Sequence, residues 1–364
     1  MEDFLFSDKA LLKIADKVRE ERRLSFEDGV LLFKSPDLLG LGYLANIVRE
    51  RKNENRAYFV NNRHINPTNI CVNLCRFCAF GKERGDKGAY ELSMDEILKK
   101  AEKGVRQGAR EFHVVGGLHP DLPFEYYLEI LKNLSLRFPD IHIQAFTAVE
   151  IDYFSRISSL SLEETLGKLK EAGLGSIPGG GAEVFSERVR ELICPKKISG
   201  ERWLEVIGTA HRLGIKSNAT MLYGHIETAQ EKVDHLLKLR ELQDETEGFM
   251  SFIPLAFHPE NTEMPDIKRT TGHQDLKHLA ISRLMLDNFP HIKAFWIMIG
   301  PKIAQISLSF GVDDIDGTVS EERITHSAGA ETEEYIPKEE LIKMIKEAGR
   351  TPVERDTVYN VLAC

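Results

Sequence analysis

The sequence predicts an α/β protein whose main part is a (β/α)8 barrel of the TIM type. Short runs of apolar and β-branched residues alternate with amphipathic helical patterns along residues 56–317, and this alternation is typical of a parallel sheet. Eight such strand–helix units can be counted, which is the number that closes a barrel. An open, doubly wound parallel sheet is the structural alternative.

The expected strands are separated by helices with recognisable ends. Ser93 and Glu96 form a capping-box pattern at the start of one helix. Gly173 is placed to end another helix, and Pro301 and Gly311 are placed at the start and end of a third. The expected strands cover residues 56–68, 111–117, 142–150, 176–181, 215–224, 249–257, 292–300 and 313–317.

The chain outside the expected barrel forms two extensions. Residues 1–55 carry amphipathic helical patterns and predict a helical extension before the barrel. The barrel itself is expected over residues 56–330. Residues 331–364 predict a C-terminal helix, "PKEELIKMIKEAG", followed by a tail.

Composition excludes several functional classes. Of the 364 residues, 42% are hydrophobic and 29% are charged, and the formal net charge is −9. An acidic chain without clustered Lys and Arg is a poor candidate for nucleic-acid binding. The first 30 residues resemble an amphipathic helix rather than a signal peptide, and no run of about 18 apolar residues predicts a membrane span. We therefore expect a cytoplasmic protein with neither a nucleic-acid nor a membrane partner.

Three of the five cysteines lie in the stretch "NICVNLCRFCAF", as Cys71, Cys75 and Cys78. They follow the first expected strand, at the end of a barrel where active sites form. In a reducing compartment such a group indicates a metal site rather than disulfides. A structural zinc site would need a fourth ligand, either a distant cysteine or His64. Three thiolates on a [4Fe–4S] cluster would instead leave one iron open for chemistry. Cys194 is expected to be a small buried residue.

The spacing C-x3-C-x2-C, with Phe77 before the last cysteine, resembles the signature of the radical S-adenosylmethionine superfamily. The stretches "HVVGGLHPDLPFEYY", "SIPGGGAEVF", "ATMLYGHIET" and "GVDDIDGT" are similar to its menaquinone/F420 branch, and "FIPLAFHPENT" and "ERITHSAGA" most resemble the aminofutalosine synthases. The resemblance covers roughly residues 60–330. It implies a [4Fe–4S] cluster on the three cysteines, S-adenosylmethionine as co-substrate, and a flavodoxin or ferredoxin as electron donor.

The resemblance also implies a reaction. A transferase of this kind adds the 5′-deoxyadenosyl radical to 3-[(1-carboxyvinyl)oxy]benzoate, with rearrangement and decarboxylation, in menaquinone biosynthesis by the futalosine route. Dehypoxanthine futalosine cyclase and the second subunit of FO synthase belong to the same branch, and the cysteine motif does not separate the three. A non-catalytic zinc- or cluster-binding protein is the alternative from another class.

Several residues are expected, on this resemblance, to contact S-adenosylmethionine. A carboxylate can accept one hydrogen bond on each oxygen, so Glu150 suits the two ribose hydroxyls. Arg190 suits a two-pronged contact with the methionine carboxylate. The glycines let the backbone approach a ligand closely, and Phe77 is expected near the adenine. The expected set is Phe77, Gly116, Gly117, Glu150, Gly180, Glu183 and Arg190.

The implied benzoate carries two carboxylates, so its site needs cations or strong hydrogen-bond donors. Candidates stand at the ends of the expected strands. His64, His119 and His258 are the expected catalytic residues, and Arg63, Asn218, Tyr223 and His225 are the expected substrate-binding residues. Asp316 and Thr318 are expected only to hold the barrel closed.

Overall fold

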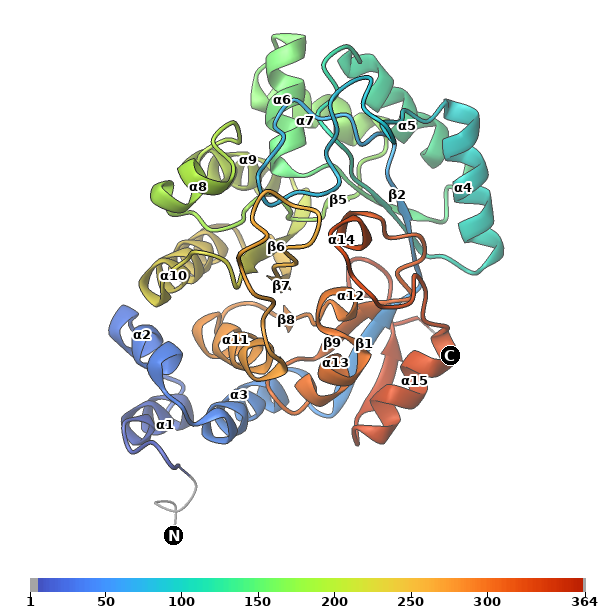
Figure 1. The fold of residues 1–364 in the computed structure, drawn as a ribbon. Helices are drawn as coiled ribbons and strands as arrows, with labels where there is room; N and C mark the ends of the chain where they lie inside the picture. Colours follow the sequence, from blue (N-terminus) through green and yellow to red (C-terminus); the bar gives the residue numbers. More distant parts are fainter. Residues whose placement is uncertain (1–5, 363–364) are drawn as a thin grey trace.

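The central feature of the fold is a curled sheet of seven parallel strands in the order β2-β3-β4-β5-β6-β7-β8. The computed structural model describes residues 6–362, and Figure 1 shows helices arranged around the sheet. The strands are β2 (Asn62–Ile65), β3 (Glu111–Val114), β4 (His142–Ala145), β5 (Ser176–Ile177), β6 (Lys216–Tyr223), β7 (Phe249–Ala256) and β8 (His291–Ile292). The prediction of a parallel α/β protein is confirmed.

A second sheet closes the barrel. β1 (Arg56–Val60) leads directly into β2 and lies between β10 (Thr351–Glu354) and β9 (Asp314–Gly317). Isolated parallel bridges join Lys293 to Asp314 and Arg63 to Ser320, so β9 lies between β8 and the first strand. The predicted barrel is present, with its first strand divided into β1 and β2 and with a seam of short bridges.

Helices cover the outer side of the sheet, as the alternating sequence pattern predicts. The capping box of Ser93 and Glu96 is present at the start of α4, and Gly173 ends α7 with a φ of +116°. α13 begins at Pro301 as expected but ends at Ser307, before Gly311. The outer helices are α4 (Met94–Arg106), α5 (Phe124–Arg137), α6 (Ala148–Ser158), α7 (Leu162–Ala172), α8 (Glu187–Ile193), α9 (Gly200–Arg212), α10 (Ala229–Thr246), α11 (Gly272–Met285), α12 (Trp296–Ile299) and α13 (Pro301–Ser307).

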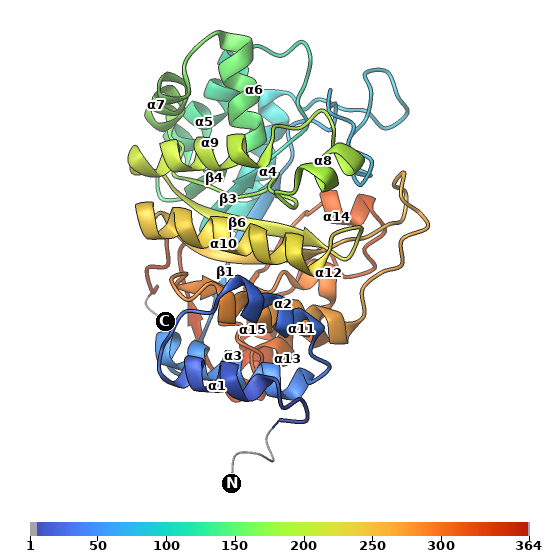
Figure 2. The ribbon, with the colours of Figure 1, turned by 90° about the vertical axis from the view of Figure 1, so that its left-hand side faces the viewer.

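Three helices precede the barrel: α1 (Leu11–Arg19), α2 (Phe26–Lys34) and α3 (Leu38–Asn53). Figure 2 shows them together at one side of the molecule. α3 packs against α11 and α2 packs against α10, so the expected helical extension is present and lies on the outer helices. Its separation from the barrel as a unit of its own stays a prediction.

The C-terminal part contains a strand that the sequence did not indicate. After α14 (Ile324–Ser327) and the expected helix α15 (Lys338–Glu347), residues of the predicted tail form β10, which pairs in parallel with β1. β10 is a half-exposed edge strand with Pro352 in it. Proline and weak apolar character are compatible with an edge strand but do not signal one.

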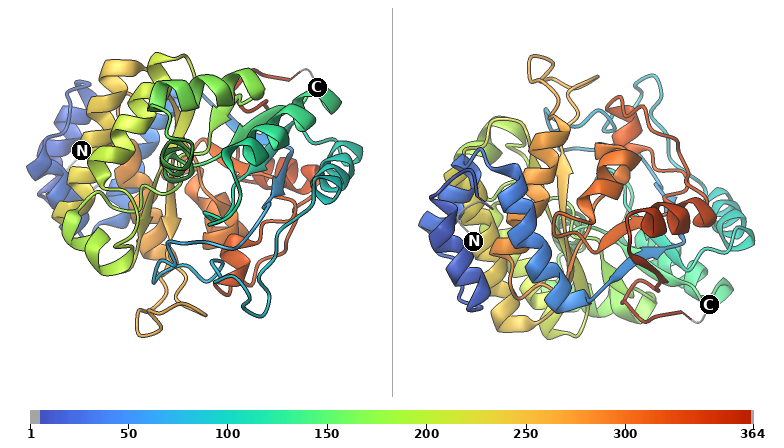
Figure 3. Two further views of the ribbon diagram at one scale, coloured as in Figure 1. Left: turned by 90° about the horizontal axis from the view of Figure 1, so that it is seen from above. Right: turned by 90° about the horizontal axis from the view of Figure 1, so that it is seen from below.

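The loops at the carboxyl ends of the strands gather at one mouth of the barrel. Figure 3 shows that the segment after β2 and the segment after β7 project on the same side. They touch each other, because the backbone N–H of Glu263 donates to the carbonyl of Arg76 at 2.9 Å. The loop with the cysteines therefore lies where barrel sites form.

Candidate active site

A cavity of about 320 Å³ occupies the carboxyl-end half of the barrel. Residues on, or directly after, every strand from β2 to β9 line it. On β3 the lining residues are Glu111 and His113, and on β6 they are Asn218, Thr220 and Leu222. Alternate residues of a barrel strand point inward, so the strand register fixes which side chains reach the cavity.

The three cysteines of the motif line this cavity together. Backbone hydrogen bonds fix their loop: Cys71 N–H donates to Lys82 at 3.0 Å, and Val72 N–H donates to Leu118 at 3.0 Å. The N–H of Gly81 lies 3.4 Å from the Cys78 sulfur, which it can reach as a donor. Burial raises the pKa of Cys75 to about 12 and also raises that of Cys78, so a bound cation is needed to hold these groups as thiolates.

The donor set suits a cluster better than one ion. Within residues 6–362, no three Cys, His, Asp or Glu side chains come close enough together to hold a single metal ion. The three thiols instead border a shared space at the cavity wall, and thiolates are the ordinary ligands of iron–sulfur clusters. The residues present therefore fit a cluster bound by three cysteines, whereas a closed zinc site would lack its fourth ligand.

Gly116 and Gly117 line the cavity, but their packing has a reason apart from any ligand. A Cβ on Gly117 would lie 2.2 Å from the carbonyl oxygen of Ile70, and one on Gly116 would lie 3.0 Å from that of Thr68. Gly117 also donates its N–H to Thr68 at 2.9 Å. These glycines let the end of β3 lie against the start of the cysteine loop. Gly180, in the segment after β5, also lines the cavity, and its carbonyl accepts a hydrogen bond from Trp203 Nε1 at 3.1 Å.

Glu150 lines the cavity from the first turn of α6 rather than from the end of a strand. Its two oxygens accept the N–H groups of Gly116, at 3.0 Å, and Thr147, at 2.7 Å. Burial raises the pKa of this carboxyl to about 7. Glu150 therefore ties β3 to α6 beside the cavity, and each oxygen keeps one further lone pair for a ligand hydroxyl.

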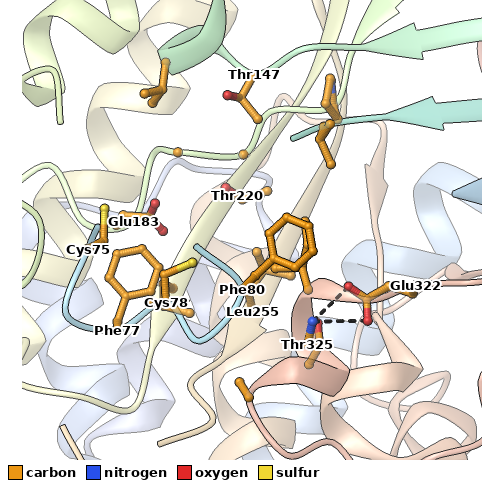
Figure 4. Close-up of a pocket in the computed structure, with 18 of the residues that line it drawn as sticks. Cys75, Phe77, Cys78, Phe80, Thr147, Glu183, Thr220, Leu255, Glu322 and Thr325 are labelled. Atoms are coloured by element: carbon orange, nitrogen blue, oxygen red, sulfur yellow. Dashed lines mark hydrogen bonds between the residues drawn. The ribbon is translucent and has the colours of Figure 1, made fainter. Parts of the chain in front are cut away.

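Glu183, which is buried, and Lys197, which is partly buried, form an ion pair beside the thiols. The ammonium of Lys197 lies 4.9 Å from the centre of the Phe77 ring. Burial opposes the charge of Lys197, but Glu183 together with the neighbouring Cys75 and Cys194 holds the pKa of the lysine above its usual value. Figure 4 shows Cys75, Cys78, Phe77 and Glu183 on the same part of the cavity wall. Lys197 thus brings a fixed positive charge to the cysteine loop.

Two of the three expected catalytic histidines lie in the cavity. His64 stacks on His113 with ring centres 4.4 Å apart, and burial lowers its pKa well below 6.5. His258 Nε2 lies 2.8 Å from the carbonyl of Met298. A carbonyl only accepts, so Nε2 carries the proton and Nδ1 is left as an acceptor. That Nδ1 is buried without a protein partner. The expected substrate residue Asn218 also lines the cavity, between Gln144 and Ser251.

Three expected substrate residues do not line the cavity. Arg63 points away from it and binds Ser320, at 2.9 Å, and Glu321, at 2.5 Å. Tyr223 is buried behind β6, where its hydroxyl donates to Asp275 at 2.8 Å. His225 lies near Glu227 and the carbonyl of Leu222. The structure places these three side chains outside the cavity lining, and their role in substrate binding stays a prediction.

Two further expected residues are placed elsewhere. His119 lies on the loop after β3, 3.2 Å from Glu91, and does not line the cavity. Arg190 donates to the carbonyls of Ala182, at 2.7 Å, and Ile198, at 2.9 Å. Its guanidinium therefore holds the glycine-rich segment from behind, and the expected contact with a bound carboxylate does not fit this position.

The structure adds cavity residues that the sequence analysis missed. Lys293 follows β8 and lies 3.1 Å from Asp316, which was expected only to close the barrel. A lysine directly after a short apolar strand was the available signal, since a buried lysine needs a reason. Glu111, Glu322 and Thr325 also line the cavity. Figure 4 shows the carboxylate of Glu322 accepting the N–H of Thr325.

Comparison with known proteins places the chain in a family. The model of the radical SAM superfamily matches residues 65–239, and that of the CofH/MqnC C-terminal region matches residues 246–364. A relative named aminodeoxyfutalosine synthase, from Thermus thermophilus, is 51% identical over 97% of this chain and 96% of its own length. The chain belongs to the radical SAM superfamily. The resemblance found in the cysteine motif is confirmed.

Further comparisons agree with this radical SAM assignment. A second relative of the same name, from Streptomyces coelicolor, is 44% identical over 96% of this chain and 93% of its own length. The solved structure of methylornithine synthase has a TM-score of 0.74, covering 93% of this chain and 96% of its own, at 18% identity, which supports the fold. Radical SAM enzymes use a [4Fe–4S] cluster and S-adenosylmethionine, the cofactors expected from the motif. Within residues 6–362 no helix has the length and apolar character of a membrane span.

Proposed function

We propose that this radical SAM enzyme catalyses the aminodeoxyfutalosine synthase reaction on 3-[(1-carboxyvinyl)oxy]benzoate. The observation that carries the proposal is one cavity that joins the three thiols to a polar floor, which is formed by His64, Glu111, Lys293 and Asp316. Relatives named for this activity span nearly the whole chain. The cyclase and the FO synthase subunit remain the alternatives from the same branch.

Cys71, Cys75 and Cys78 would hold the cluster, and the wall formed by Phe77, the Gly180 segment and the Glu183–Lys197 pair would receive S-adenosylmethionine. When bound, the cluster supplies the electron that cleaves S-adenosylmethionine and releases the 5′-deoxyadenosyl radical. The proposed reaction then joins C5′ to the CH₂ carbon of the enol ether. The aryl group would then move from the ether oxygen to the carbon that carries the enolpyruvyl carboxylate. That carboxylate would leave as CO₂, and the remaining electron would return to the cluster.

The protein has to hold the alkene near C5′ and keep other hydrogen donors away. Residues of the strands from β2 to β9 and of the cysteine loop surround the cavity, and walls on these sides limit the access of water to a reactive primary radical. Apolar lining residues Leu222, Leu255 and Phe295 offer a surface for the aromatic ring. His258 presents Nδ1 as a fixed acceptor, which can orient a donor group of the nucleoside.

The electron would come from a flavodoxin or ferredoxin, as the family resemblance implies. The cysteine loop reaches the outer face of the barrel mouth, where Val72 is 37% exposed. A redox protein can therefore approach the loop from solvent, without opening the barrel.

An anaerobic assay tests the proposed function. Cluster-loaded protein is mixed with dithionite, S-adenosylmethionine and the benzoate, and the nucleosides are analysed by mass spectrometry. The proposal predicts a product in which the adenosyl group is joined to the benzoate skeleton, with release of methionine. Formation of 5′-deoxyadenosine alone, with the benzoate unchanged, would overturn the proposal and point to the cyclase or the FO synthase subunit.

A further inference from the structure

Lys293 is a buried cation on the polar floor of the cavity. It follows β8, at the seam where an isolated bridge joins it to Asp314 on β9. Its side chain is 7% exposed, and its ammonium lies 3.1 Å from Asp316. Both Lys293 and Asp316 line the cavity. Removing an ammonium from water is costly unless hydrogen bonds and charges compensate it.

The hydrogen-bonding capacity of this floor is only partly used. An ammonium has three N–H donors, and within the described part of the chain Lys293 donates one hydrogen bond, to Asp316. His64, which is 6% exposed, has its Nε2 buried without a partner. Glu111, the other floor carboxylate, lies 3.8 Å from His113 Nδ1 and so has a partner of its own. Unused donors and an unpartnered ring nitrogen at one place indicate a site for a polar ligand group.

The cavity separates its two cations. Lys197 and Lys293 are the only Lys or Arg side chains that line it within residues 6–362. The charge of Lys197 acts on the thiols of Cys75 and Cys78, whereas that of Lys293 acts on His64 and Glu111. Lys197 is thus at the end where the cluster would be held, and Lys293 is available to a substrate group at the floor.

We propose that Lys293, oriented by Asp316 and aided by His64, binds the ring carboxylate of the benzoate substrate. The inference rests on the proposed function. An ion pair stabilises a carboxylate in its charged form and so opposes its loss as CO₂. The ring carboxylate stays in the product, whereas the enolpyruvyl carboxylate leaves. A cation should therefore bind the ring carboxylate, and the apolar residues Leu222, Leu255 and Phe295 should surround the enolpyruvyl carboxylate.

Equilibrium binding without reductant tests this, because nothing turns over. Cluster-loaded protein with S-adenosylmethionine is titrated with the benzoate and with 2-phenoxyacrylate, which lacks the ring carboxylate. Loss of one partner of a buried charge pair predicts that Lys293→Met weakens binding of the benzoate about 30- to 100-fold and leaves 2-phenoxyacrylate unchanged. Lys293→Arg should keep most of the preference for the benzoate. Lys302→Met, at an exposed lysine of α13, is the matched control and should bind like wild type.

The outcomes separate this inference from the proposed function. If Lys293→Met weakens binding of the benzoate and of 2-phenoxyacrylate equally, or changes neither affinity, the proposed role of Lys293 is overturned, even if wild type forms the joined nucleoside. Retained binding of S-adenosylmethionine by Lys293→Met shows that the variant is folded. Wild type that neither binds the benzoate nor forms the joined product would overturn the proposed function and, with it, this inference.

Discussion

Leu74, Glu183 and Asp316 are non-glycine residues of the cavity lining with φ angles in the left-handed region, at +41°, +44° and +66°. Each such residue costs on the order of 1–3 kcal/mol and persists only where surrounding contacts fix it. Glu183 is fixed by Lys197, and Asp316 by Lys293. Strain at the residue scale therefore coincides with the two ion pairs of the cavity.

The cysteines allow a matched comparison at this scale. We expect Cys75→Ala to lower the iron bound after reconstitution from about four per chain to less than about one, because a cluster ligand is lost. S-adenosylmethionine cleavage should fall to background. Cys194→Ala, at a buried cysteine outside the motif, should keep the bound iron and the cleavage of S-adenosylmethionine at the wild-type level. Iron analysis and 5′-deoxyadenosine release measure this, and normal iron content in Cys75→Ala would refute its role as a ligand.

At the scale of elements, α14 and the turn before it form one wall of the cavity, through Glu322, Ile324 and Thr325. His326, on the same helix, lies 3.1 Å from the carboxylate of Glu322 and bonds through its other ring nitrogen to the carbonyl of Thr332. The hydrogen bond to Glu322 raises the pKa of His326 to about 9. This pair therefore holds the wall in place while the histidine is protonated.

The raised pKa predicts a pH dependence of this wall. A histidine whose folded-state pKa exceeds its usual value of about 6.5 gives its full stabilisation below that value and loses it as pH rises through about 9. We expect amide exchange protection of residues 324–329 to fall between about pH 7 and pH 10, after correction for the intrinsic rate. His326→Gln should remove this dependence, and His273→Gln, at an exposed histidine of α11, should retain it. The same pH profile in wild type and His326→Gln would contradict the assignment.

Element types were predictable because buried parallel strands appear as apolar runs and capped helices carry end signals. Several side-chain directions follow from the sequence as well, because strand residues alternate between two faces. Neighbouring strand residues face opposite sides, so Arg63 and His64 cannot both reach the cavity. By the same alternation, Asn218 and Tyr223, which are five residues apart on β6, face opposite sides, so only one of them can line the cavity. The positions of His119, His225 and Arg190 depend on loop and turn packing, which has no such periodicity.

At the scale of the whole molecule, the C-terminal residues stabilise the seam of the barrel. Arg355, which follows β10, is 1% exposed and donates from Nε to Asp314 at 2.7 Å. Tyr359 donates to the same carboxylate at 2.8 Å. Asp314 lies on β9, which pairs with β1 on one side and forms a bridge to Lys293, directly after β8, on the other. Arg355 and Tyr359 thus hold β9, the strand that closes the barrel beside Lys293.

This arrangement predicts a large stability effect far from the cysteines. Arg355→Met leaves Asp314 as an uncompensated buried charge, which costs about 3–5 kcal/mol. We expect a clear fall in the denaturant midpoint of unfolding. Lys343→Ala, at a lysine of α15 whose side chain is 71% exposed, should change stability by less than about 0.5 kcal/mol. Equal midpoints for the two variants would show that the C-terminal pairing does not stabilise the barrel.

The central claim is that one cavity joins the adenosyl group to the benzoate. The most direct measurement uses S-adenosylmethionine with two deuterons at C5′ and the benzoate labelled with ¹³C in its ring. Radical addition predicts one nucleoside product that carries the ring label and both deuterons. A nucleoside fraction that lacks the ring label, with 5′-deoxyadenosine that carries two deuterons and one hydrogen at C5′, would contradict the account and assign the enzyme to hydrogen-abstraction chemistry.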